Sequence, residues 1–122
     1  MIRKLMTRHF AKWAKNRKVS DESLKKALDE VESGNFEADL GGHIIKKRIS
    51  FAGKGKRGSG RTVICFRKED RAFFIHGFSK NEYSDITAKE LDAFKLLAKI
   101  LLSLSDGQLD IAIQNNNFKE LE

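Results

Sequence analysis

Residues 61–78 read RTVICFRKEDRAFFIHGF and contain the two most strand-like stretches of the chain. Both halves are rich in β-branched and aromatic side chains, which favour a pleated backbone that is buried on at least one face. Glu69 and Asp70 separate the halves and indicate a tight turn, so we expect an antiparallel hairpin. The run HIIKKRISF at residues 43–51 has the same character and extends the hairpin into a sheet.

Helical spacing replaces this pattern on the N-terminal side of the strands. Residues 8–17 place Phe10 and Trp13 on one apolar face, and both aromatic side chains are expected to join the core. Ser20 is the predicted cap of a second helix, which ends near Gly34. The two helices are joined by a short turn and therefore form an α-hairpin.

The C-terminal part of the chain is also helical by pattern. Thr87 is the predicted cap of a long amphipathic helix, with Glu90 as its capping-box partner, and Ser105 caps a shorter helix. Residues 118–122 return as a final edge strand. Residues 2–7 fit either a short edge strand or the start of the first helix, and both interpretations stay open. The order of α-hairpin, antiparallel sheet and helix predicts an α+β domain.

Length and composition bound the class of protein. The 122 residues, at 13.9 kDa, suffice for one domain, residues 1–122, with a single core. One cysteine excludes a disulfide framework and a multi-cysteine zinc site, and the three histidines are scattered, so we expect no metal and no cofactor. The longest apolar run, residues 94–104, contains two lysines and is too short to cross a bilayer. A reduced, cytoplasmic setting is the simpler expectation.

The net charge of +7 is unevenly distributed along the chain. Residues 46–71 carry ten basic and two acidic side chains, a balance of +8 within 26 residues. Residues 19–45 and 72–122 are acidic, with balances of −5 and −3. A strongly basic stretch attracts polyanions such as nucleic acid and speeds their encounter. The alternative is a solvated surface that the acidic segments partly neutralise.

Alternation along the strands predicts which basic side chains share a face. Lys46 and Arg48 point to the same side of the first strand, as do Arg61 and Arg67 in the second. Lys47 points mostly toward the core. Because helices must cover the apolar face, we expect the opposite face to form a shallow basic platform built from Lys46, Arg48, Arg61 and Arg67.

The loop between these strands, AGKGKRGSGR at residues 52–61, adds Lys54, Lys56 and Arg57 to the same end of the sheet. Its glycine spacing matches a dinucleotide-binding fingerprint, but that fingerprint opens a helix and this loop opens a strand. The loop fits a flexible basic clamp for a phosphate backbone. A hairpin connection that lysines keep soluble is an equally good interpretation.

Cleavage of RNA is a chemistry that such a surface can support. The ribose 2′-OH attacks the adjacent phosphate, so the protein needs no metal and no nucleophile of its own. Arginine suits the stabilisation of the charged transition state, because its fork binds two phosphate oxygens and never loses its proton. The basic face is compatible with this chemistry without requiring it.

Two further side chains have reactive potential. Cys65 is expected to be a buried small residue, because no histidine is placed to activate it. By alternation His76 lies with Phe74 and Phe78, where a histidine is more often a packing residue. If His76 instead faces the basic platform, it becomes the best general acid or base near neutral pH.

Four short motifs follow one another along the chain: ADLGG at residues 38–42, KKR at 46–48, GKGKRGSGR at 53–61 and GFSKNE at 77–82. Their order resembles the RelE-like toxins of bacterial toxin–antitoxin modules, and the HigB-like group in particular. The resemblance runs from about residue 8 to the end. It implies a RelE-like fold, with an N-terminal α-hairpin packed on a small antiparallel sheet, then a long helix and a short C-terminal helix and strand.

The resemblance also implies an activity and partners. Proteins of this kind are ribosome-dependent mRNA endoribonucleases that arrest growth until a cognate antitoxin binds. The antitoxin is expected to carry a DNA-binding helix-turn-helix. No metal and no membrane enter this picture. The implied targets are therefore the ribosome and mRNA.

Site residues follow by matching positions to the family motif. Arg61 matches the arginine that contacts the scissile phosphate, and Lys80 the lysine of the post-strand motif. Asn81 stands where better-studied relatives carry an arginine, and Tyr83 is the nearest substitute for their later tyrosine. The expected catalytic residues are Arg61, Lys80, Arg48 and Tyr83. The expected RNA-binding residues are Lys46, Lys47, Lys54, Lys56, Arg57 and Arg67.

Two other functions fit the same sequence. A non-catalytic nucleic-acid or ribosome-binding domain would use the same basic face. A related toxin directed at DNA gyrase would share the fold and the basic character.

Overall fold

The computed structural model describes residues 2–50, 59–79 and 86–121. Within these ranges the elements follow the order β1 (Arg3–Thr7), α1 (Arg8–Asn16), α2 (Asp21–Glu32), β2 (Ala38–Asp39), β3 (Ile44–Ser50), β4 (Ser59–Arg67), β5 (Arg71–Ser79), α3 (Ala88–Ser103), α4 (Asp106–Gln114) and β6 (Phe118–Glu120).

The predicted helix caps are confirmed. The Ser20 hydroxyl accepts the backbone N–H of Ser23 at the start of α2, and Gly34, with φ of +86°, follows the end of that helix. Thr87 and Glu90 form a reciprocal capping box at the start of α3. Ser105 caps α4 in the same way. Local sequence therefore sets where these helices begin.

The strands form one six-stranded sheet in the order β2-β3-β4-β5-β1-β6. The β4–β5 hairpin and the edge position of β6 are confirmed. The expectation of a purely antiparallel sheet is wrong, because β1 pairs parallel to β5. β1 is also an interior strand and not an edge strand or a helix start. The reason is that Leu5 and Met6 are both buried, one on each face of the sheet.

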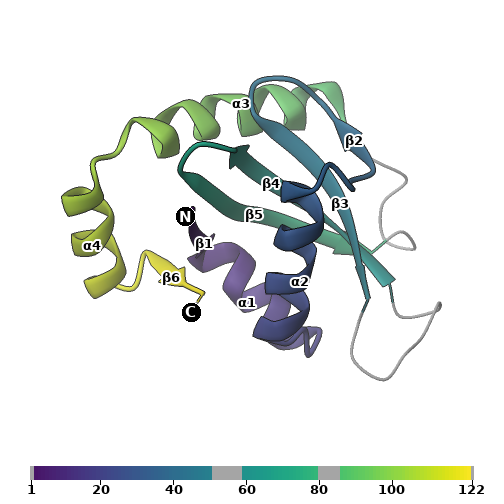
Figure 1. The fold of residues 1–122 in the computed structure, drawn as a ribbon, viewed down its shortest axis with the longest axis horizontal. Helices are drawn as coiled ribbons and strands as arrows, with labels where there is room; N and C mark the ends of the chain where they lie inside the picture. The colour runs from purple at the N-terminus through teal and green to yellow at the C-terminus, as the bar shows by residue number, and fades with distance from the viewer. Residues whose placement is uncertain (1, 51–58, 80–85, 122) are drawn as a thin grey trace.

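The first and last strands are held together by one arginine. β1 pairs antiparallel with β6, and the Arg3 guanidinium reaches three carboxylates around that junction. Its Nε lies 2.9 Å from Glu120, and its terminal nitrogens lie 2.9 Å from Asp110 and 3.3 Å from Asp106. The strands at the two ends of the chain therefore lie together at one edge of the sheet (Figure 1).

Helices cover both faces of the sheet (Figure 1). α1 and α2 pack on one face in a core that includes Phe10, Leu28 and Phe74. α3 and α4 pack on the other face around Phe73 and Leu101. The predicted open basic face is therefore wrong, because the α3–α4 layer covers most of the face where it was expected. Basic side chains can reach solvent only where this layer ends.

A bulge changes the alternation in β5. Val63 pairs with His76 but the next residue, Ile64, pairs with Phe74, so Ile75 is the extra residue. Beyond the bulge, His76 and Phe78 face the α3–α4 layer, whereas Phe74 faces α1 and α2. The prediction that all three share one face is wrong for this reason.

Candidate functional site

Two arginines face each other at one end of the sheet. Arg48 in β3 is the register partner of Arg61 in β4, just before the chain passes from Ser50 to Ser59. Directly opposed side chains on one face have Cβ atoms about 5 Å apart, and like charges there are unfavourable without a counter-charge. Arg48 is exposed, whereas the Arg61 side chain is only 13% exposed.

Glu37 supplies the counter-charge. Its Oε1 lies 2.8 Å from Nε of Arg61, and its Oε2 lies 3.7 Å from Nζ of Lys46. The backbone N–H of Glu37 donates to the carbonyl of Lys46, which fixes this residue beside the start of β2. Nη1 of Arg61 is buried and donates to no group in residues 2–50, 59–79 or 86–121. Glu37 thus orients the guanidinium of Arg61 through Nε and leaves Nη1 without a hydrogen-bond acceptor in these ranges.

Glu37 is a site residue that sequence reasoning missed. It is one of seven acidic side chains in residues 19–45, and the two-residue strand that follows it has no readable periodicity. Only the pairing of β2 with β3 brings it to the arginines. The basic side chains were the one feature of the sequence that pointed to such a residue. Two neighbouring arginines repel each other, and a nearby carboxylate offsets that repulsion.

A cavity of about 500 Å³ opens beside the arginine pair. Arg48, Arg61 and Lys47 contribute positive charge to its wall, and Glu30 and Glu37 contribute negative charge. Lys46 lies beside Glu37 and adds a further cation. This arrangement can hold an anion that touches Arg48 first, because Arg48 is the exposed member of the pair.

Lys47 lies on the other side of the strand from Arg48. It is 6% exposed, its Nζ lies 3.2 Å from Glu30, and it donates to the carbonyl of Asn35 at 3.0 Å. These partners tie β3 to the end of α2. The ammonium of Lys47 is therefore held inside the α1–α2 side of the molecule.

Arg67 lies at the opposite end of β4. Its Nε and Nη2 each lie 2.7 Å from a carboxylate oxygen of Asp70, and Nη2 also donates to the carbonyl of Leu102. The hydrogen bond from Arg67 lowers the pKa of Asp70. Arg67 lies six residue steps along an extended strand from Arg61, a distance of about 20 Å. The structure brings Lys46, Arg48 and Arg61 together and leaves Arg67 apart.

Five predicted site residues lie outside the described ranges: Lys54, Lys56, Arg57, Lys80 and Tyr83. The described residues that flank them lie beside the arginine pair. Ser50 and Ser59 are register partners, and Gly60 pairs with Ser79. The chain therefore leaves and re-enters the sheet at the end where Arg48 and Arg61 stand.

His76 is half-buried under the N-terminal half of α3. Its ring stacks on His9 with centroids 5.6 Å apart and planes 3° apart, and it also contacts Phe78 and Phe94. Burial lowers the pKa of His76, and the nearby His9 lowers it further. These contacts are those of a packing residue, and the lowered pKa favours the neutral form of the ring.

Other reactive chemistry is sparse in the part of the chain that the structure describes. Cys65 is buried as predicted, and desolvation raises the pKa of its thiol to about 12. Among residues 2–50, 59–79 and 86–121, no group of three or more His, Cys, Asp or Glu side chains could hold a metal ion. No helix in the same ranges is long and apolar enough to span a membrane.

Comparison with known families identifies the family to which this fold belongs. The family model for the RelE toxin of the RelE/RelB toxin–antitoxin system matches residues 2–121, which include every described helix and strand. The chain belongs to the RelE toxin family. The RelE match starts earlier than the predicted resemblance and takes in β1, the strand that completes the sheet between β5 and β6. Assignment to the HigB-like group within RelE toxins stays a prediction.

Proposed function

We propose that this RelE-family toxin is a ribosome-dependent mRNA endoribonuclease. The observation that carries the proposal is the Arg48–Arg61 pair, held by Glu37 at the end of the sheet with one buried guanidinium donor left over. Two opposed guanidinium groups beside a cavity suit a phosphodiester, which needs charge neutralisation on two oxygens.

The proposed reaction uses the RNA as its own nucleophile. The 2′-oxygen loses its proton and bonds to phosphorus, the bond from phosphorus to the 5′-oxygen breaks, and the 5′-oxygen takes up a proton. The products are a 2′,3′-cyclic phosphate and a 5′-hydroxyl, so the proton lost and the proton gained balance. Negative charge grows on the two non-bridging oxygens in the transition state. Arg48 and Arg61 stabilise this charge, and Glu37 keeps Arg61 oriented so that little reorganisation is needed during the reaction.

The proposal adds residues that flank the pair in sequence. Lys80 and Tyr83 follow β5, and the basic segment with Lys54, Lys56 and Arg57 links β3 to β4. We assign Lys80 and Tyr83 to catalysis and the three loop cations, with Lys46, to binding of the RNA backbone. Lys47 and Arg67 are left out, because internal carboxylates already hold their cationic groups.

The same proposal covers the biological setting. The protein would belong to the HigB-like group, act in the cytoplasm on ribosomes that carry mRNA, and be neutralised by a cognate antitoxin with a helix-turn-helix. Support for the group comes from the GFSKNE motif, and support for the antitoxin from membership of the RelE family.

The test is a cleavage assay on programmed ribosomes. Purified protein should cut a defined message within codons when the ribosome is present, and Arg61→Ala should not. Arg8→Ala, which removes an exposed arginine from α1, is the matched control and should cut normally. An intact message at full ribosome occupancy would instead favour a binding domain. Inhibited DNA supercoiling without loss of message would favour a gyrase-directed toxin.

A further inference from the structure

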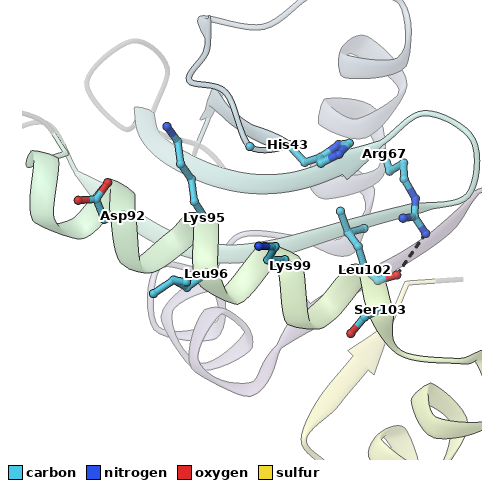
Figure 2. A pocket seen from close by; sticks show the side chains of 9 residues that line it. His43, Arg67, Asp92, Lys95, Leu96, Lys99, Leu102 and Ser103 are labelled. Atoms are coloured by element: carbon cyan, nitrogen blue, oxygen red, sulfur yellow. Dashed lines mark hydrogen bonds between the residues drawn. The ribbon is translucent and has the colours of Figure 1, made fainter.

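A second cavity lies at the other end of the molecule from the arginine pair. This groove encloses about 750 Å³ between α3, from Asp92 to Ser103, and the turn that leads into β3. Figure 2 shows Lys95 and Lys99 along α3, with His43 and Arg67 across from them. Arg67 marks the groove as belonging to the far end of β4, about 20 Å along the strand from Arg61.

One exposed apolar side chain lines this groove, and a second lies beside it on α3. In the described ranges the exposed large apolar side chains are Leu96, Ile100 and Ile111, all on α3 and α4. Leu96 is 66% exposed and lines the groove, and Ile100, one helical turn further along α3, is 60% exposed. Two neighbouring exposed apolar residues on one helix face favour contact with another apolar surface over contact with water.

The rim of the groove is basic. Lys95 and Lys99 form no ion pair with any residue in the ranges 2–50, 59–79 and 86–121, whereas Arg67 is already paired with Asp70. The backbone of Gly42, with φ of +58°, lies against the stem of Lys95, where a Cβ atom would come within 2.8 Å of Cγ. This close approach fixes the Lys95 stem along the wall of the groove. Among the described residues that line the groove, Asp92 is the one that carries a carboxylate.

We propose that this groove is the docking site for an acidic amphipathic helix of the antitoxin, an inference that rests on the proposed toxin function. Apolar residues at helical spacing would cover Leu96 and Ile100, while flanking Asp or Glu side chains would meet Lys95 and Lys99. The apolar wall favours a protein helix over RNA, since a phosphate backbone gains nothing from Leu96. The antitoxin would then hold the toxin without contacting Arg48 or Arg61.

The first test measures affinity for the protein encoded by the reading frame adjacent to the toxin. Toxin carrying Arg61→Ala is the common background, so that it can be produced without growth arrest. Leu96→Glu and Ile100→Glu should each weaken binding by about tenfold or more. Each variant places a carboxylate against the apolar face of the antitoxin helix and close to the acidic side chains that flank it. Ile111→Glu is the matched control: Ile111 is 59% exposed but lies on α4, not beside Leu96 on α3, and this variant should bind normally.

The second test addresses charge. Lys95→Glu and Lys99→Glu should weaken binding and reduce its salt dependence, whereas Lys26→Glu on the exposed side of α2 should change neither. Equal affinity of the groove and control variants would overturn the proposal. So would loss of toxin self-association in Leu96→Glu, which would make the occupant a second copy, or weaker mRNA binding in that variant, which would make it RNA.

The two proposals fail separately. With Arg61 intact, Leu96→Glu toxin should cut message on ribosomes at the normal rate but should need about tenfold or more of the adjacent protein for the same inhibition. If wild-type toxin cuts no message, the proposed function is wrong, while the affinities still decide the groove. If cutting is normal and Leu96→Glu remains fully inhibited, only the docking proposal is wrong.

Discussion

Each end of β4 carries an arginine paired with a carboxylate, but the two arginines differ in how completely their hydrogen-bond donors are used. At one end Arg67 meets Asp70, three residues away in the same turn, and its bonds are completed by the carbonyl of Leu102. At the other end Arg61 meets Glu37, 24 residues away, and keeps a buried donor without a partner in the described part of the chain. The satisfied arginine closes a turn, whereas the arginine with an unpaired donor is the one that we propose binds the phosphate of RNA.

Loss of Arg61 should have the largest effect of any change at either end of β4. Arg61→Ala is expected to lower the rate of message cleavage by about 100-fold or more, because it removes donors from the transition state. Circular dichroism should show an unchanged fold. Arg61→Lys keeps the charge without the fork and should recover only part of the rate. Normal growth arrest by Arg61→Ala would remove this residue from the mechanism.

The orienting carboxylate should have the next largest effect. Glu37→Gln is expected to lower kcat by about tenfold, because Arg61 loses the charge that aims it. RNA affinity should rise slightly, because one negative charge leaves the cavity wall. Single-turnover cleavage and RNA binding, measured on the same preparation, separate the two effects. A fall in affinity with unchanged kcat would contradict the positioning role.

Arg67 should behave as a stability residue. Arg67→Ala is expected to lower the free energy of unfolding by about 1 kcal/mol, because a bidentate but partly exposed pair is lost. Cleavage per folded molecule should stay at the wild-type rate. Denaturant unfolding and the ribosome assay measure the two quantities. A cleavage defect as large as that of Arg61→Ala would mean that the two ends do not differ.

Salt dependence sharpens the same contrast. RNA binding should weaken as salt rises, because each phosphate contact releases counterions. Arg48→Ala should reduce the slope of log affinity against log salt by about one, and Arg67→Ala should leave it unchanged. Affinity that is insensitive to salt would contradict phosphate binding at the Arg61 end.

The smallest expected effect concerns the pH dependence of stability, and it comes from His76, opposite the middle of β4. His76, the partner of Val63, has a pKa below the ordinary value, so the unfolded chain binds more protons than the folded one as pH falls. Stability should therefore be full above about pH 7 and decrease toward pH 5. His76→Phe should flatten this decrease in thermal unfolding. An unchanged pH profile would show that burial of His76 does not control it.

What sequence could predict follows from how local each feature is. The Ser20, Thr87 and Ser105 caps and the hairpin at Glu69 depend on residues within one turn of each other, so their patterns were readable. The interior place of β1 depends on pairing with residues about 70 positions away, which no local pattern encodes. The bulge at Ile75 is likewise set by packing on both faces.

The candidate site shows the same division. The alternation within each strand, combined with the assumption that helices cover the apolar face, placed Arg48 and Arg61 on one face, and their register pairing agrees with this. It could not show that helices cover the rest of that face, because this depends on where α3 packs. Nor could it identify Glu37, whose role arises from the register of β2 against β3.

The junction of β1 with β6 has a consequence for the order of folding. Arg3 stays without its carboxylate partners until residues 106–120 have been synthesised, and β1 cannot take its place beside β5 before residues 71–74 exist. A nascent chain therefore holds an unfinished sheet for most of its synthesis. The folded toxin can therefore form only late in synthesis, after its C-terminal strand has been made.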